Sequence, residues 1–206
     1  MEQRTEEWYA SRLGKVTASR VADVIAKTRT GYSASRQNYL TDIVIERLTG
    51  KPTESFTNDA MLWGIETEPF ARMAYEVETG NFVTEVGLID HYSIANFGAS
   101  PDGLIGDLGL LEIKCPNSKT HLETIMSNTA PTKYIPQMMA QMACTNRAWV
   151  DFVSFDPRMP EDLQLFIKRV PRDDSYIASL EQEVSLFLNE VENTLIELKG
   201  FKHGCN

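Results

Sequence analysis

A short apolar segment that carries two opposite charges is the strongest constraint on how this chain folds. Residues 110–115 are mostly aliphatic and are followed by Pro116, which is typical of a short, largely buried strand. Side chains alternate between the two faces of a strand, so Glu112 and Lys114 share one face and their aliphatic neighbours share the other. A carboxylate and an ammonium in such a strand are costly unless partners satisfy them. The sequence therefore predicts a buried strand with a polar site on one face.

The turn Ser100-Pro101-Asp102-Gly103 brings a second carboxylate toward that face. A divalent cation best offsets the repulsion between two converging carboxylates. Mg²⁺ takes one or two carboxylates from a protein while keeping several waters. Such an ion polarises a phosphoryl oxygen and lowers the pKa of a bound water. Lys114 would orient or deprotonate that water, or neutralise charge on a phosphate. The pattern indicates a metal-dependent phosphodiesterase centre; the alternative is a structural Glu–Lys pair beside an unrelated turn.

Length and composition suit one α/β domain spanning residues 1–206. The sequence has no run of 18 apolar residues, so no membrane span is predicted. Its first residues lack the apolar region of a secretory signal. Cys115, Cys144 and Cys205 are odd in number and far apart, which favours free thiols in a reducing cytoplasm and argues against a zinc site. We therefore expect a cytoplasmic protein.

The net charge of −9 is unevenly distributed. Residues 12–36 hold six Lys or Arg and one Asp, a local charge of six minus one, or +5; residues 174–198 hold six acidic and no basic residues, or −6. Because screening confines fields to about 8 Å at physiological salt, an acidic protein can still hold a polyanion in a basic groove. The alternative is that both runs are solvated helix faces.

The order of predicted elements is that of a mixed α/β domain. Helices are expected after residues 17–19, before Gly50, from the Asn58 cap to Gly80, at 119–127, at 133–144, and at the C-terminal end. Strands are expected at about 82–89, 97–100, 110–115, 149–155 and 163–170, and residues 27–36 are expected to form a basic loop. The last helix carries an apolar stripe at 3–4 residue spacing, which favours a core-facing helix over an oligomer seam.

Six short motifs occur in one order along nearly the whole chain: Trp8-x3-Arg12-x4-Thr17-Ala18-Ser19, Trp63-Gly64-x3-Glu68, Ser100-Pro101-Asp102-Gly103, Glu112-Ile113-Lys114-Cys115-Pro116, Tyr134-x2-Gln137 and Phe155-Asp156-Pro157-Arg158-Met159. With them the chain resembles the lambda-type phage exonucleases of the YqaJ-like viral recombinase family, within the restriction-endonuclease-like PD-(D/E)xK superfamily. The resemblance implies a restriction-endonuclease-like core, in which helices flank a central mixed β-sheet. It also implies a ring-shaped homotrimer that degrades one strand of linear duplex DNA from 5′ to 3′.

The resemblance also implies roles for particular residues. Asp102, Glu112 and the Ile113 carbonyl would hold Mg²⁺, with Mn²⁺ as a possible substitute, while Glu68 would lie beside the ion and Lys114 would act on the attacking water. A pocket for the 5′-phosphate would be formed by Arg12, Thr17, Ser19, Ser100 and Gln137, with a helix N-terminus at Ser19 contributing to the cradle.

Two further residues match DNA-contacting positions of the family. Arg29 matches an arginine that follows the duplex groove, and Met61 occupies the position of an apolar wedge that separates the terminal base pairs. The alternative for Met61 is ordinary helix packing. Where the family often has Gln-x-Gln, this chain has Gln137-Met138-Met139 and a further glutamine at Gln141. A single-strand annealing protein is the partner that the family implies, in phage-type recombination.

Three other readings remain to be compared with the exonuclease. A non-catalytic DNA-end clamp would use a basic groove without needing Asp102, Glu112 and Lys114. A glycosidase would use the two carboxylates directly, but Lys114 would keep Glu112 ionised, which suits a metal ligand better than a general acid. A structure-specific endonuclease on the same core is the nearest alternative, and a covalently closed circle distinguishes the two.

Overall fold

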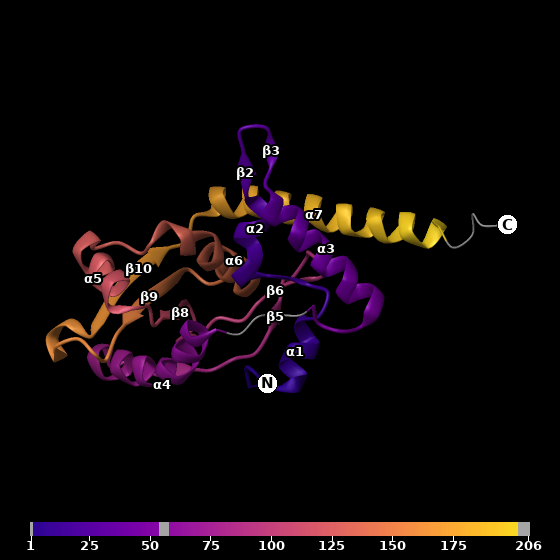
Figure 1. Cartoon of the computed structure of the whole chain (residues 1–206). Helices are drawn as coiled ribbons and strands as arrows, with labels where there is room; N and C mark the ends of the chain where they lie inside the picture. The colour runs from indigo at the N-terminus through magenta and orange to yellow at the C-terminus, as the bar shows by residue number, and fades with distance from the viewer. Residues whose placement is uncertain (1, 54–57, 202–206) are drawn as a thin grey trace.

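The structure is a computed structural model that describes residues 2–53 and 58–201 (Figure 1). Its largest sheet is a mixed sheet of five strands. The strands lie in the order β10-β9-β8-β7-β4. Their bounds are Leu165–Pro171 for β10, Trp149–Phe155 for β9, Gly109–Lys114 for β8, Gly103–Ile105 for β7 and Val83–Thr84 for β4. Strands β8 and β9 are parallel, and the other neighbouring pairs are antiparallel. The predicted mixed sheet and the strand at 110–115 are thereby confirmed.

The two faces of β8 pack against different helices. Leu111 and Ile113 join an apolar cluster with Ala71 and Tyr75 of helix α4 (Asp59–Thr79). Leu110, on the opposite face, joins the larger cluster, which includes the buried side of helix α6 (Ile135–Thr145). Glu112 lies on the α6 face of the strand because it is two residues from Leu110. The alternation predicted from the sequence therefore fixes which helix can reach Glu112.

A second layer covers α6 on its far side. It consists of helices α2 (Val21–Ile25), α3 (Ala34–Thr49) and α7 (Asp174–Phe201), and a small sheet of β1 (Val16–Thr17), β6 (Phe97–Ala99) and β5 (Ile89–Asp90). The predicted stripe of α7 is buried from Ile177 to Leu195, which confirms a core-facing helix. The other two α-helices of the described residues are α1 (Glu6–Arg12) and α5 (Ser118–Ser127).

Helix ends follow the sequence signals. The Asn58 side chain accepts a hydrogen bond from the Met61 amide at the start of α4, and Gly80, with a φ of 69°, ends that helix. Gly50, with a φ of 66°, ends α3 in the same way. A side chain at either glycine would meet the strain of the left-handed region. These two C-termini were predicted correctly.

Several short elements differ from the sequence prediction. The strand predicted at 82–89 is two strands, β4 and β5, which belong to different sheets, and Gly87 lies between them. The predicted basic loop contains a hairpin of β2 (Lys27–Thr28) and β3 (Gly31–Tyr32), where Gly31 adopts a φ of 138°. Helix α1 and strand β7 were not predicted. Strands of two or three residues are too short to produce a periodic signal, and the seven residues of α1 include no buried side chain that would mark an apolar face.

The basic and acidic segments of the sequence lie against each other. Lys27 of the hairpin pairs with Glu183 of α7 at 2.6 Å, and Tyr32 donates to the same carboxylate at 2.8 Å. Buried Arg36 forms two hydrogen bonds with Glu190, at 2.6 and 2.9 Å, and also donates to a backbone carbonyl of α2. The two charge runs are therefore neither two solvated faces nor one continuous basic groove.

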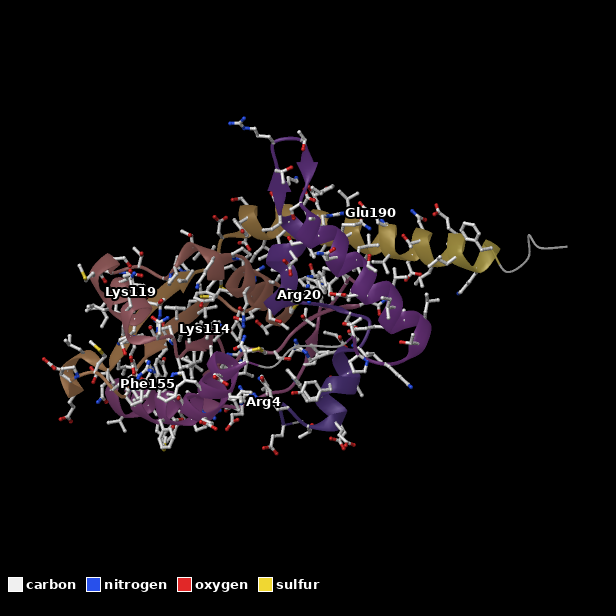
Figure 2. All side chains as sticks on the ribbon, viewed as in Figure 1. Arg4, Arg20, Lys114, Lys119, Phe155 and Glu190 are labelled. Carbon is white, nitrogen blue, oxygen red and sulfur yellow. The ribbon has the colours of Figure 1, made fainter. Side chains whose placement is uncertain are left out.

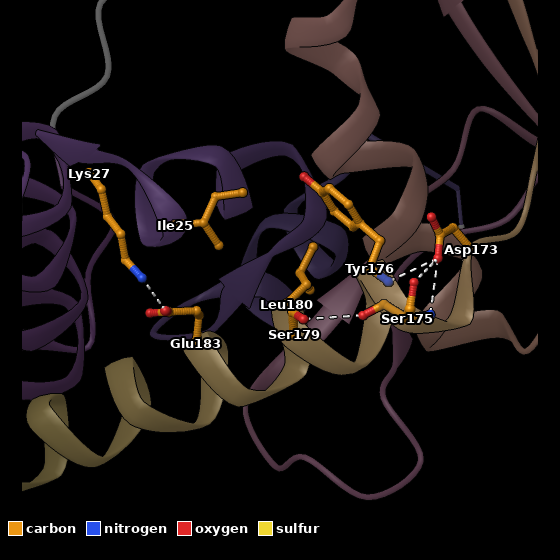
Figure 3. A pocket seen from close by; sticks show the side chains of 8 residues that line it. All are labelled: Ile25, Lys27, Asp173, Ser175, Tyr176, Ser179, Leu180 and Glu183. Carbon is orange, nitrogen blue, oxygen red and sulfur yellow. Dashed lines mark hydrogen bonds and ion pairs between the residues drawn. The ribbon is translucent and has the colours of Figure 1, made fainter.

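A cavity of about 440 Å³ lies beside the base of the hairpin (Figure 3). Ile25, Lys27 and residues of the first turns of α7 line it, and the Lys27–Glu183 pair crosses one side. None of the residues that the sequence assigns to the functional site lines this cavity. It is therefore separate from the predicted functional site.

We predict that Glu190→Ala lowers the free energy of unfolding by about 1–3 kcal/mol, because Arg36 is then left buried with its charge unpaired. Figure 2 shows Glu190 on α7. The control is Glu123→Ala, which breaks an exposed pair with Lys119 and should change stability by less than about 0.5 kcal/mol. Urea denaturation measures both, and equal losses in the two variants would contradict the role of the Arg36–Glu190 pair.

Candidate active site

The Pro-Asp turn and strand β8 form one hydrogen-bonded unit. The Asp102 amide donates to the Leu111 carbonyl at 3.1 Å, and the Asp102 carboxylate accepts from the Ile113 amide at 2.6 Å. The second bond continues the edge of β8 beyond the last β7–β8 pair, Gly103–Leu111. The turn and the strand are therefore joined in space, as the predicted site requires.

Glu112 is fully buried, and three donors satisfy its carboxylate. Lys114 Nζ lies 2.5 Å from Oε1, and Gln137 Nε2 donates to the same oxygen at 2.6 Å. Gln141 Nε2 donates to Oε2 at 2.5 Å. All three donors lie on the α6 side of the sheet, and they account for a charge in an apolar strand.

The electrostatics of the site show crowded negative charge. Burial, followed by the nearby Glu112 and Glu68 carboxylates, raises the pKa of Asp102 well above its ordinary value. Burial lowers the pKa of Lys114, but Glu112 and Asp102 outweigh burial and raise it overall. Burial, followed by the Glu68 and Asp102 carboxylates, raises the pKa of the Cys115 thiol to about 12. A positive charge beyond that of Lys114 would relieve this repulsion.

The residues present fit a hard divalent cation. Asp102 and Glu112 supply carboxylate oxygens, and the Ile113 carbonyl points to the same strand edge as its amide, which Asp102 binds. Within residues 2–53 and 58–201, no three His, Cys, Asp or Glu side chains form a metal-binding group. Two carboxylates and a carbonyl suit Mg²⁺, which retains waters and uses few protein ligands, better than they suit zinc.

The N-terminal segment reaches this site, which the sequence did not predict. Arg4 forms an ion pair with Glu68 of α4, and Gln3 donates to the Pro101 carbonyl at 2.8 Å. Glu68 is close enough to raise the pKa of Asp102. The structure therefore places Glu68 beside the carboxylate pair, with a counter-ion of its own.

Four of the five residues predicted to bind a phosphate lie together. Arg12 donates to Ser100 Oγ at 3.2 Å and to Ser19 Oγ at 3.3 Å, and Thr17 Oγ1 lies 3.3 Å from Ser19 Oγ. Trp8 supports the cluster, because its indole donates to Ser100 at 3.0 Å and its ring stacks 4.2 Å from the Arg12 guanidinium. We call Arg12, Thr17, Ser19 and Ser100 the anion pocket.

Arg12 in the anion pocket has no carboxylate partner among the described residues. Burial is the main cause that lowers the pKa of Arg12. Of the six basic residues between 12 and 36, only Arg12 and Arg29 lack an ion pair in the described structure. A desolvated guanidinium surrounded by hydroxyl groups is suited to bind an anion.

The helix N-terminus predicted at Ser19 is a 3₁₀ turn that continues into a short α-helix. Ser19 lies in a 3₁₀ turn, Ala18–Arg20, and α2 begins after it at Val21 and contains five residues. The side chain at the N-cap position, Arg20, makes no capping hydrogen bond. Hydroxyl groups and the Arg12 guanidinium, rather than a helix N-terminus, therefore form the cradle.

The remaining predicted residues lie outside the anion pocket. Gln137 contacts Glu112 instead, while Met139 is buried in the core. Arg29 is exposed in the turn of the β2–β3 hairpin, and Met61 is 49% exposed in the first turn of α4. Met61 is therefore not part of the buried core, and the DNA-contacting roles predicted for Arg29 and Met61 stay proposals.

The motif at residues 155–159 supports the chain that leaves strand β8. Arg158 forms hydrogen bonds with Asp156 at 2.7 and 3.0 Å and donates to the Pro116 carbonyl at 3.2 Å. Its guanidinium also stacks 4.4 Å from the Trp63 ring of α4. These contacts hold Pro116, two residues beyond Lys114, against α4.

Sequence reasoning did not assign roles to Trp8 or Gln141. Both carried a usable signal, because Trp8 precedes Arg12 by four residues and Gln141 follows Gln137 by four residues. Residues four apart on a helix lie on the same face. That spacing identifies both as neighbours of a predicted site residue.

Comparison with known proteins gives a consistent result. The family model of the YqaJ-like viral recombinase domain matches residues 7–148. The chain belongs to this family. The solved structure of LHK-Exo, an alkaline exonuclease from Laribacter hongkongensis, shares 56% sequence identity and a TM-score of 0.92, covering 98% of this chain and 100% of that one. The same values hold for LHK-Exo in complex with dAMP.

A more distant solved structure shares the fold. A phage-related exonuclease from Haemophilus somnus 129PT is 14% identical, with a TM-score of 0.69 over 89% of this chain and 96% of that one. The predicted restriction-endonuclease-like fold is confirmed. No match is found among curated proteins. No helix in the described ranges is long and apolar enough to cross a membrane.

Proposed function

We propose that this YqaJ-like protein is a Mg²⁺-dependent exonuclease that degrades one strand of linear duplex DNA from 5′-phosphorylated ends, 5′ to 3′. The products are mononucleotides and a 3′ single-stranded overhang. One observation carries the proposal: Ser100 of the anion pocket is two residues from Asp102 of the carboxylate pair. A terminal phosphate in the pocket would place the next phosphodiester beside the carboxylates. The dAMP complex of the 56% identical LHK-Exo supports a deoxynucleotide ligand.

Each residue then has a defined task. Arg12 and the hydroxyl groups of the pocket bind the terminal phosphate, which sets the register of the strand without reading its sequence. Asp102, Glu112 and the Ile113 carbonyl would hold the ion, which when bound polarises the phosphoryl group and acidifies water. Lys114, between Glu112 and the Tyr134 ring, supplies a positive charge where the transition state gains negative charge. Glu68 orients water at the edge of the site.

Two exposed residues would handle the duplex. Arg29, unpaired in the hairpin turn, would follow the groove of the incoming DNA. Met61 would separate the terminal base pairs, since unbranched apolar side chains can insert between bases. The hairpin is suited to this task because Glu183 holds both of its strands on α7.

We also propose a ring-shaped homotrimer that threads the remaining strand and acts in the cytoplasm of a bacterial host, encoded by a phage or prophage. A single-strand annealing protein would bind the 3′ overhang that this exonuclease produces. Apolar side chains are exposed along the outer face of α4, among them Ile65, Phe70, Met73 and Val77, as expected of a surface that subunits bury.

We predict that Lys114→Ala lowers the rate of nucleotide release by about 100-fold or more, because the transition-state charge loses its stabilising cation. The substrate is linear duplex labelled at either end, beside a covalently closed circle, in Mg²⁺ or EDTA. Lys119→Ala is the matched control, since Lys119 is exposed on α5 (Figure 2). If the circles are cut, the activity is that of an endonuclease and the exonuclease proposal is wrong. If the DNA is bound but stays intact, the protein is an end clamp.

We predict that Arg12→Ala slows digestion of 5′-phosphorylated ends by about 10- to 100-fold, the loss expected for hydrogen bonds to a charged group, and changes 5′-hydroxyl ends little. Arg20→Ala is the control, because Arg20 is already paired with Asp23. Initial rates on the two kinds of end give the ratio. An equal loss on both would contradict anchoring by the anion pocket.

For the trimer, light scattering should give a mass three times the 23.2 kDa of one chain. Met73→Glu on the exposed face of α4 should lower that mass, because a charge would be buried between subunits. A single-chain mass for the unmodified protein would contradict the ring.

A further inference from the structure

Gln141 is a polar side chain that the proposed reaction does not yet use. It is fully buried on α6 and donates to Glu112 Oε2 at 2.5 Å. Its own carbonyl oxygen, Oε1, is buried and has no hydrogen-bond partner among the described residues. Gln137, one helical turn earlier, donates to the other oxygen of the same carboxylate.

The two oxygens of Glu112 are not equivalent. Oε1 accepts from both Lys114 Nζ and Gln137 Nε2, so both of its lone pairs are used. Oε2 accepts from Gln141 alone, which leaves one lone pair for a further partner. Oε2 is therefore the oxygen of Glu112 that is able to bind a cation.

The hydrogen bond also fixes the orientation of the Gln141 amide. The NH₂ group must face Glu112, because the opposite orientation would place two acceptors against each other. The amide oxygen is thereby directed away from Glu112, where it lacks a donor. Buried acceptors in proteins are almost always satisfied by protein or by ordered water, so this oxygen marks a place for a donor such as a water molecule.

We propose that Gln141 is a positioning residue for the divalent cation: it turns Glu112 so that Oε2 binds the ion, and its own carbonyl oxygen accepts a hydrogen bond from a water of the site. The inference rests on the metal centre of the proposed function. It assigns unequal roles to two glutamines of the same helix, since Gln137 shares Oε1 with Lys114 whereas Gln141 alone holds Oε2.

The test is the affinity for Mn²⁺, measured by isothermal titration calorimetry without DNA. Gln141→Met keeps the length of the side chain and removes the amide, and Gln137→Met is the matched control. We expect Gln141→Met to raise the Kd for Mn²⁺ by about 10- to 100-fold, the usual effect of losing a partner of a metal ligand. Gln137→Met should raise it by less than about threefold, because Lys114 still holds Oε1.

A double-mutant cycle separates positioning from a merely structural role. In a Glu112→Gln background, Gln141→Met should add less than a twofold loss of Mn²⁺ affinity, because its effect passes through Glu112. A further tenfold loss in that background, or an unchanged Kd for Gln141→Met alone, would overturn the proposal. Failure of the unmodified protein to bind Mn²⁺ would instead overturn the metal centre itself.

Circular dichroism melting identifies variants that do not fold. If Gln141→Met does not fold, Gln141→Asn replaces it, because asparagine keeps the amide one methylene short of Glu112. We expect the same tenfold or greater rise in Kd for Gln141→Asn. An Mn²⁺ affinity within twofold of the unmodified protein would overturn the proposal with this variant also.

Discussion

The buried carboxylate of Glu112 is the constraint on which the rest of the site depends. A charge with no exposure to solvent must be compensated locally. Helix α6 supplies two amide donors, and Lys114 supplies a counter-ion from the same strand. The parallel pairing of β8 with β9 and the packing of α6 on that face are therefore as much parts of the site as the carboxylate. The structure retains a costly charge where a cation would use it.

The arrangement of positive charge follows the same logic. Four of the six basic residues between 12 and 36 are paired with acidic partners, two of them on α7. Arg12 and Arg29 form no ion pair with a described residue: Arg12 is half-buried among hydroxyl groups, and Arg29 is exposed in a hairpin turn. An acidic protein can in this way still present positive charge where a phosphate is expected, since screening confines each field to its neighbourhood. Net charge is thus a poor guide to this chain's ligand.

Much of this architecture could be predicted from sequence, for physical reasons that can be named. The alternation around Glu112 fixed the two faces of β8, and Asn58, Gly50 and Gly80 marked helix ends through capping and left-handed backbone. The hydrogen bond from the Ile113 amide to the Asp102 carboxylate could not be predicted in the same way. The sequence of a turn does not indicate which strand edge the turn contacts. The contact of Arg4 with Glu68, between residues 64 positions apart, depends on tertiary packing alone.

The central claim is that Asp102 and Glu112 form one cation site at the edge of β8. The most direct measurement is anomalous scattering from crystals of the protein grown with Mn²⁺. The account predicts a single strong peak about 2.1 Å from an Asp102 carboxylate oxygen, Glu112 Oε2 and the Ile113 carbonyl. A strong peak elsewhere, with none between Asp102 and Glu112, would contradict it.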